Sequence, residues 1–282
     1  MVLVAVLLSS SICGRCDSAD AAGKHDMNKV ADTNAAVIKT VTLTVAEGKR
    51  LIAKGLARYA SVQEKMANGT VIVCRGSSNT YVAEELLKTN LAHGAFMTGR
   101  IQPEGSAPLP VQSSIGEIVI RNGIYQPIYQ PDTKFIDGLR SMQSGDIIFK
   151  GANLVNYKDR KAAVCIAHPT GGTTGLLLPF VEEQGVRLII PVGLEKQTSQ
   201  NLDELEAVTR EDNLIPWLKV LPGEIFTEIE AIKQFADVEV YQLASGGISG
   251  AEGGVMLAIK GSPVEVEKAL AAVAAVRGEP PF

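Results

Sequence analysis

The chain has 282 residues, which is room for one large α/β domain, or for one such domain with a small appendage. A net charge of −4 at pH 7 argues against a nucleic-acid-binding protein, because such a protein presents a basic face. A single tryptophan and an aromatic content of 5% argue against a surface on which bases or sugars stack, and four cysteines are too few for a disulfide framework in a chain of this length.

Residues 1–26 are expected to be a leader rather than part of the fold. The stretch from Met1 to Leu8 is apolar, and a run of small residues that ends at Ala22 resembles the cleavage site of a secretory signal peptide. No lysine or arginine precedes the apolar stretch, so the alternative is a misassigned start, with translation beginning at Met27. The misassigned start predicts a cytoplasmic protein, and the signal peptide predicts an exported one. No later segment is long and apolar enough to span a membrane.

The first half of the remaining chain reads as helix, strand, turn and helix. Thr44-Val45-Ala46-Glu47 is a capping box, in which the hydroxyl and the carboxylate each accept a hydrogen bond from a free N–H group at a helix start. An apolar strand at 70–75 follows, and then a polar turn and a helix at 79–89. Five prolines between residues 101 and 132 predict an irregular segment or an edge strand there.

The second half repeats the alternation of strands and helices. The pattern predicts a helix at 133–142, strands at 145–150 and 161–167, a helix at 176–184 and a strand at 186–192. The last of these strands is apolar throughout, which is typical of a parallel sheet covered on both faces. The C-terminal residues read as strand, helix, strand, strand and helix, and this βαββα order is most of a ferredoxin-like unit.

The predicted fold is therefore α/β, with a doubly wound, mostly parallel sheet and a small ferredoxin-like α+β subdomain at the C-terminus. After the leader at 1–26, residues 27–212 would form the α/β ligand-binding domain. Residues 213–282 would form the βαββα subdomain.

The turn after the first strand is suited to an anion. It places small polar residues between a strand end and a helix start, where unpaired backbone N–H groups and the positive end of the helix dipole meet. A plain tight turn is the alternative, but open α/β sheets bind ligands at the carboxyl ends of their strands, where this chain has an arginine. The candidate anion-binding residues are Arg75, Gly76, Ser77, Ser78, Asn79 and Thr80.

Two further strand ends carry polar residues. His168 begins a loop whose glycines allow a ligand to approach the backbone and whose threonine hydroxyls can donate to oxyanions. His168 can act as an acid or a base, and the alternative is a turn with a structural histidine. Lys150 is either a solvated strand end or a partner for a phosphate or carboxylate. The candidate ligand-binding residues at these two places are Lys150, Gly151, Asn153, Thr170, Gly171, Gly172, Thr173 and Thr174.

From residue 44 onward, the order of elements and loops resembles the superfamily of phosphosugar isomerases and CoA-transferase-like proteins, with ribose 5-phosphate isomerases as the nearest pattern. The resemblance implies that residues 75–80 take the place of the loop that binds the sugar phosphate. It also implies that residues 170–175 take the place of a later glycine loop. The C-terminal residues would correspond to the ferredoxin-like lid of these isomerases.

The acidic motif of these isomerases is absent. Lys150, Asn153 and Asn156 stand where its acids would stand, and an amide cannot take a proton from carbon at neutral pH. Ordinary ribose 5-phosphate isomerase activity is therefore not expected. The resemblance to CoA transferases implies a glutamate that forms a thioester, for which Glu195 and Glu252 are the candidates. Together with His168, these two glutamates are the candidate catalytic residues.

The expected function is the binding of a small anionic metabolite, such as a sugar phosphate, a carboxylate or a CoA-type ligand, at the strand ends. Isomerase or transferase activity would accompany binding in an enzyme. The alternative is a non-catalytic ligand-binding or sensor protein that has lost the acidic active site, and the sequence does not decide between them. No cluster of histidine, cysteine or acidic residues has metal-ligand spacing, so neither a metal nor a cofactor is expected. No nucleic acid or membrane partner is expected for the mature chain, and a homo-oligomer stays open.

Overall fold

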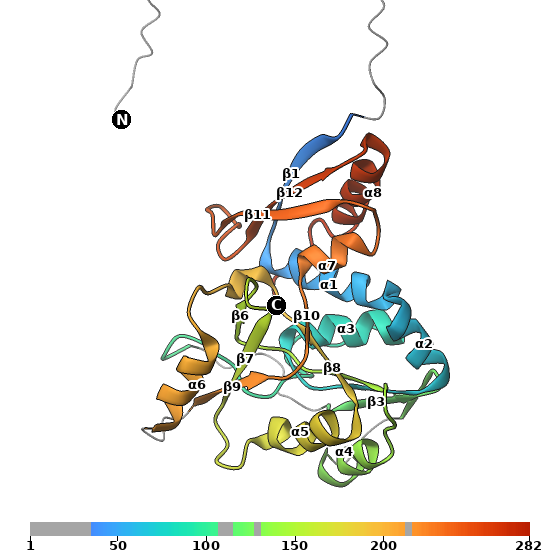
Figure 1. The fold of residues 1–282 in the computed structure, drawn as a ribbon, viewed down its shortest axis with the longest axis vertical. Helices are drawn as coiled ribbons and strands as arrows, with labels where there is room; N and C mark the ends of the chain where they lie inside the picture. Colours follow the sequence, from blue (N-terminus) through green and yellow to red (C-terminus); the bar gives the residue numbers. More distant parts are fainter. Residues whose placement is uncertain (1–34, 107–114, 127–130, 212–215) are drawn as a thin grey trace, which may run out of the picture. The chain divides into compact units, whose positions relative to one another are not determined.

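The computed structural model describes residues 35–106, 115–126, 131–211 and 216–282. These residues form a mixed α/β fold with eight α-helices, one six-stranded sheet and two three-stranded sheets (Figure 1). The α/β class predicted from the sequence is therefore confirmed. The expected leader at residues 1–26 lies outside the described residues.

The six-stranded sheet has the order β10-β8-β5-β2-β3-β4. Its parallel strands are β2 (Thr70–Val73), β5 (Ile147–Phe149), β8 (Arg187–Pro191) and β10 (Glu224–Phe226), and its antiparallel strands are β3 (Ile118–Arg121) and β4 (Ile124–Gln126). Because the sheet is mixed, a doubly wound parallel sheet is not confirmed. The edge strand predicted for the proline-rich residues 101–132 is confirmed, since β3 and β4 form one edge of this sheet.

Helices cover both faces of the six-stranded sheet (Figure 1). One face carries α1 (Val45–Arg58), α2 (Ala60–Asn68), α3 (Ser77–Leu87) and α7 (Glu228–Lys233), and the other carries α4 (Pro131–Arg140) and α5 (Gly172–Gln184). Successive strand residues alternate between the two faces: Val71 packs with the first group of helices and Ile72 with the second. None of the described helices has the length and apolar character needed to cross a membrane.

The start of α1 agrees with the sequence prediction, whereas the start of α5 differs from it. The capping box is confirmed, because the Glu47 amide donates to the Thr44 hydroxyl at 3.2 Å and the Glu47 carboxylate accepts from the Thr44 amide at 3.0 Å. Helix α5 begins at Gly172, earlier than the expected 176. Gly171, directly before the helix, adopts a positive φ of 88°, which glycine tolerates. Gly175 has no side chain, and a side chain there would overlap the Thr170 carbonyl oxygen. These two glycines allow the helix to begin at Gly172.

The remaining strands form two antiparallel sheets. One contains β6 (Leu154–Asn156), β7 (Lys161–Ile166) and β9 (Trp217–Leu221), and the other contains β1 (Val37–Leu43), β12 (Val255–Gly261) and β11 (Glu239–Ser245). Helix α6 (Leu202–Glu211) packs on β9, and α8 (Pro263–Ala274) packs on β1 and β12. The strands after residue 213 thus belong to three different sheets, and β12 pairs with β1 from the start of the fold. A ferredoxin-like subdomain formed by residues 213–282 is not confirmed.

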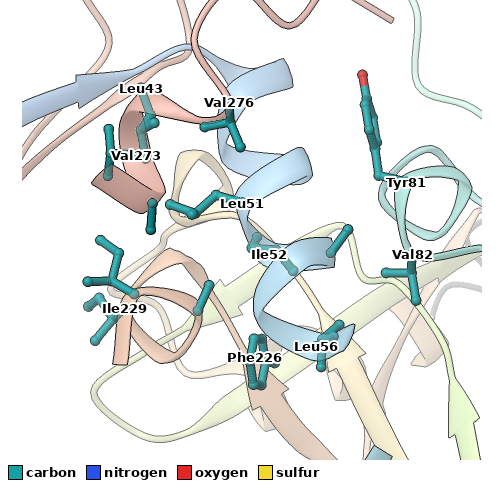
Figure 2. Close-up of a cluster of buried hydrophobic side chains, with 14 of the residues drawn as sticks. Leu43, Leu51, Ile52, Leu56, Tyr81, Val82, Phe226, Ile229, Val273 and Val276 are labelled. Carbon is teal, nitrogen blue, oxygen red and sulfur yellow. The ribbon is translucent and has the colours of Figure 1, made fainter. Parts of the chain in front are cut away.

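The largest hydrophobic cluster centres on α1 (Figure 2). Leu51, Ile52 and Leu56 are fully buried, and Figure 2 shows them between Ile229 of α7 and Val82 of α3. Each of these leucine and isoleucine side chains contributes about 1.5–3 kcal/mol through burial. At the α7 side the two backbones approach closely, since a Cβ atom on Gly55 would lie 2.6 Å from the Ala231 Cα atom.

We expect Gly55→Ala to destabilise the protein. Alanine is favoured over glycine inside a helix by about 1 kcal/mol, but overpacking against a fixed backbone costs about 1–3 kcal/mol. The matched control is Gly138→Ala in α4, where the new Cβ would lie 3.0 Å from a Val119 methyl group, which can move. Urea unfolding should show a loss for Gly55→Ala and little change or a gain for Gly138→Ala. Equal effects in the two variants would contradict the close α1–α7 contact.

Candidate functional site

The carboxyl ends of β2, β5 and β8 meet at one edge of the sheet, because these three strands are adjacent and parallel. The side-chain amide of Asn79, at the start of α3, donates to the carbonyl oxygens of Cys74 at 2.7 Å and Phe149 at 3.1 Å. Asn79 is fully buried, and its own carbonyl oxygen Oδ1 has no hydrogen-bond partner. The first predicted loop is thereby attached to the ends of both β2 and β5.

Two buried lysines lie at this edge without a hydrogen-bond or ion-pair partner among the described residues. Lys150 follows β5 and is 8% exposed, and Lys49, one turn into α1, is 9% exposed. Among the residues that the structure describes, neither ammonium group has a hydrogen-bond acceptor or an ion-pair partner. Neither nitrogen is among the fully enclosed side-chain atoms that lack a partner, so each keeps some contact with solvent. Burying an unpaired ammonium costs free energy, which makes both positions unusual.

Two glutamates lie beside these lysines. Glu228, at the start of α7, is 1% exposed and accepts a hydrogen bond from the Leu194 amide at 3.0 Å. Glu195 lies in the short 3₁₀ helix η1 (Leu194–Lys196), and its Oε1 atom is enclosed without a hydrogen-bond partner. The Lys196 ammonium is 4.0 Å from that carboxylate and donates to the Ala152 carbonyl oxygen at 2.9 Å. The loops after β5 and β8 are joined by this lysine.

Each glutamate carboxylate lies against the α-carbon of a glycine. A Cβ atom on Gly48 would lie 2.6 Å from Glu228 Oε1, and a Cβ atom on Gly193 would overlap Glu195 Oε2. The absence of a side chain at these two positions therefore gives the carboxylates their space. Gly48 and Gly193 belong to α1 and to the β8–η1 connection, so the two carboxylates are positioned from different elements.

Burial shifts the proton affinity of three groups in this cluster. Burial, followed by the charge of Glu195, raises the pKa of Glu228 to about 8. Burial, followed by the neighbouring Lys196 ammonium, lowers the pKa of Lys49 to about 8, while Glu195 acts in the opposite direction. Burial also lowers the pKa of Lys150. At neutral pH the cluster therefore holds a protonated carboxyl group at Glu228, and Lys49 releases its proton more readily than an ordinary lysine.

A third carboxylate connects the two loops predicted from the sequence. Glu117, directly before β3, is 2% exposed, and its Oε1 atom accepts from Arg75 Nε at 3.1 Å and from the Thr173 hydroxyl at 3.3 Å. Arg75 lies in the loop after β2, and Thr173 lies in the first turn of α5. The charge of Glu117 also acts on Lys150. The structure therefore brings the first loop, the second loop and the end of β5 to one place.

We call the charged residues at this edge the strand-end cluster: Lys49, Arg75, Glu117, Lys150, Glu195, Lys196 and Glu228. Of the residues expected from the sequence, it contains Arg75, Lys150 and Glu195. Asn79 and Thr173 touch it through the contacts above. Gly76 precedes α3 and its N–H group donates to the Phe96 carbonyl oxygen at 3.1 Å, Ser77 and Ser78 lie in the first turn of α3, where backbone N–H groups lack helical partners, and Gly151 follows Lys150.

Other expected residues lie elsewhere or already have structural partners. His168 is exposed, and its Nδ1 atom is 3.0 Å from the Thr170 hydroxyl. Glu252 is exposed in the β11–β12 loop, where it accepts from the Gly250 amide at 2.7 Å. The side-chain oxygen of Asn153 accepts from the Cys165 amide at 2.9 Å, which ties two strands of the β6-β7-β9 sheet region together. Thr80, Gly171, Gly172 and Thr174 belong to the two helix starts. The proposed roles of all these residues stay predictions.

Sequence reasoning missed Lys49, Glu117, Lys196 and Glu228. Lys49 and Glu228 lie near the starts of two helices whose capping boxes are readable in the sequence, Thr44 with Glu47 and Thr227 with Glu230. Nothing in that local pattern shows that the helix starts face the strand ends. Lys196 follows the candidate Glu195 directly in the sequence, and its side chain is only 24% exposed.

A contrasting hollow lies over β7 and β9, where the cations are paired. It is lined in part by Lys161 and Lys219, which bind Asp203 and Glu206. Within the described part of the chain, no group of three or more histidine, cysteine or acidic residues is arranged to hold a metal ion. The unpaired lysines therefore distinguish the strand-end cluster from this second charged surface.

Glu228→Gln should stabilise the protein increasingly as the pH rises. A carboxyl group whose pKa is higher in the folded than in the unfolded chain stabilises the fold fully below its unfolded pKa, 4.5, and this contribution is lost as the pH rises toward 8. Glutamine keeps the shape without ionising in the unfolded chain. Its advantage in unfolding free energy should grow by up to about 1.4 kcal/mol per pH unit between about pH 5 and pH 8.

Glu230→Gln, on the same helix, is the matched control for this prediction. Burial raises the pKa of Glu230, but hydrogen bonds from Thr227 and Tyr157 outweigh it, so the net shift is downward. This variant should lose stability at neutral pH and less in acid, which is the opposite trend. Denaturant unfolding at a series of pH values measures both. A pH-independent difference for Glu228→Gln would show that Glu228 is ionised in the folded protein.

Comparison with protein-family models, with curated proteins and with solved structures found no match to this chain. The resemblance to phosphosugar isomerases and CoA transferases therefore stays a prediction from motifs and element order. The chemistry of the strand-end cluster is the basis on which a function can be argued.

Proposed function

We propose that the protein binds a small anionic metabolite at the strand-end cluster. The observation that carries the proposal is Lys150, a lysine that is 8% exposed and has no partner among the described residues. A bound phosphate or carboxylate would offset the cost of burying this ammonium group. It would also restore the charged form that burial disfavours, since burial lowers the pKa of Lys150.

Neighbouring groups support an anion rather than a neutral ligand. Arg75 and Lys196 add positive charge, and the free N–H groups at the start of α3 lie next to Asn79, whose amide contacts the ends of β2 and β5. The Thr173 hydroxyl, which now donates to Glu117, is a further donor near Arg75.

The resemblance to phosphosugar isomerases is consistent with this site. The resemblance assigns a sugar phosphate to residues 75–80, next to Lys150. If it holds, the six-stranded sheet would correspond to the doubly wound sheet of the superfamily. The antiparallel strands near the C-terminus would then stand for its ferredoxin-like lid. The proposed ligands are phosphate monoesters or carboxylates of small metabolites.

For a reaction, isomerisation by proton transfer fits the cluster better than acyl transfer. Glu195 can serve as a base, and Glu228, whose pKa burial raises to about 8, can serve as an acid. Acyl transfer through a thioester on Glu195 would leave the protonated Glu228 carboxyl group without a role.

Lys150→Met tests the anion site. Wild type and variant would be unfolded thermally with inorganic phosphate, sugar phosphates, carboxylates and CoA esters. A ligand at about 100 times its dissociation constant should add roughly 2.7 kcal/mol to the wild type. The variant should lose most of this gain while its ligand-free form stays as stable or becomes more stable, because methionine removes an unpaired buried charge.

Lys39→Met, at an exposed position on β1, is the control and should keep the full ligand effect. If no anion stabilises the wild type, the proposed site fails. Full stabilisation of Lys150→Met would show that anions bind elsewhere. If Arg75→Ala leaves the ligand effect unchanged, the 75–80 loop has only a structural role.

Glu195→Gln tests the proton transfer. In deuterated water, the wild type should exchange the hydrogen next to the carbonyl carbon of an aldose or ketose phosphate that stabilises it, and NMR follows this exchange. Loss of the base should slow exchange by about 100-fold or more, with little change in ligand stabilisation. Glu252→Gln, at the exposed candidate, should exchange at the wild-type rate. Normal exchange by Glu195→Gln would rule out Glu195 as the base.

A further inference from the structure

Lys49 differs from the other cations of α1. Its neighbour Arg50 forms ion pairs with Glu84 at 2.6 Å and Glu279 at 2.8 Å, and Lys54 pairs with Glu85 at 3.3 Å. Lys49 is more buried than Lys54 and has no such partner among the described residues. A cation that served only the stability of α1 would be expected to pair as these two do.

The surroundings of Lys49 are those of a reactive amine. The charges of Lys196 and Glu195 act on it directly, and the Phe282 ring lies on one side, with its centroid 5.6 Å from Lys49 Nζ. Gly48, the preceding residue, contacts the Glu228 carboxyl group. The Lys49 amine is therefore close to the charges of Lys196 and Glu195, the residue before it contacts the Glu228 carboxyl group, and the amine keeps some contact with solvent.

We propose that Lys49 forms an imine with the bound metabolite, which is therefore an aldehyde or a ketone that also carries an anionic group. This inference rests on the proposed anion site at Lys150 and adds the second functional group of its ligand. Lys150 and Arg75 would hold the anion, and Lys49, which enters the cluster from α1, would reach the carbonyl carbon.

The chemistry balances within the cluster. The neutral amine of Lys49 attacks the carbonyl carbon, a C–N bond forms, and a proton moves from nitrogen to oxygen to give a carbinolamine. The Glu228 carboxyl group then protonates the hydroxyl, the C–O bond breaks and water leaves. The products are a protonated imine on Lys49 and an ionised Glu228. Glu195 is the nearby base that can remove a proton from the adjacent carbon of the imine.

The lowered proton affinity of Lys49 makes the first step accessible. With a pKa of about 8, roughly a tenth of the Lys49 side chains are neutral at pH 7, whereas an ordinary lysine is neutral in about one molecule in several thousand. Lys196 contributes to this shift and Glu195 opposes it. The exposed lysines of the chain lack this advantage.

Pyridoxal 5′-phosphate, which carries an aldehyde and a phosphate, is the probe for this proposal. The full-length protein would be incubated with limiting probe, reduced with borohydride and digested, and the labelled peptides identified by mass spectrometry. Lys49 should be labelled at least about tenfold more than Lys54, the paired and more exposed lysine of the same helix. Inorganic phosphate should protect Lys49, and Lys150→Met should reduce its labelling.

One variant keeps the test independent of folding. Lys49→Arg retains the charge and cannot form an imine, so it should lose the label while circular dichroism stays that of the wild type. Labelling that spreads over exposed lysines and spares Lys49 would overturn the inference. If phosphate still stabilises the wild type in that case, the anion site stands and only the imine is wrong. If phosphate neither stabilises nor protects, the proposed function fails as well.

Discussion

The packing of α1 between α3 and α7 is the constraint on which the rest of the structure depends. Gly55 lets α1 lie against the α7 backbone at Ala231, and the buried face of α1 joins the six-stranded sheet to the sheet of β1, β11 and β12 in a single hydrophobic cluster. The same contact sets where the start of α1 lies. Lys49 and Gly48, one turn before this buried face, are thereby fixed beside Glu228 and the end of β8.

The strand-end cluster is costly for the ligand-free fold. Two unpaired lysines and a protonated glutamate are each less stable buried than exposed, and the cluster also leaves Asn79 Oδ1 and Glu195 Oε1 without donors. Elsewhere in the described chain, cations such as Arg50 are paired. A fold that satisfies its charges at one place and leaves them unsatisfied at another has the pattern of a binding site, where a ligand completes the missing contacts.

The sequence predicts features that depend on neighbouring residues and misses those that depend on packing. The Thr44–Glu47 capping box and the strand–turn–helix around Arg75 are local, and both are present. Lys150 is predictable because it ends an apolar strand. Glu228 is not, because its helix is short and only the contact of that helix with α1 buries it. For the same reason a helix pattern cannot distinguish Lys49 from the paired Lys54, five residues further along one helix.

The pKa shifts within the cluster are linked, so a bound anion also changes the protonation of the groups around it. Burial moves Lys49 and Lys150 toward their neutral forms and Glu228 toward its acid form, so all three avoid charge for the same reason. A bound anion favours the charged form of Lys150 and disfavours an ionised Glu228 nearby. It would thus strengthen its own binding and keep Glu228 protonated until imine formation needs that proton. A neutral carbonyl compound provides neither effect, so the reaction of the carbonyl group of the proposed ligand depends on its anionic group.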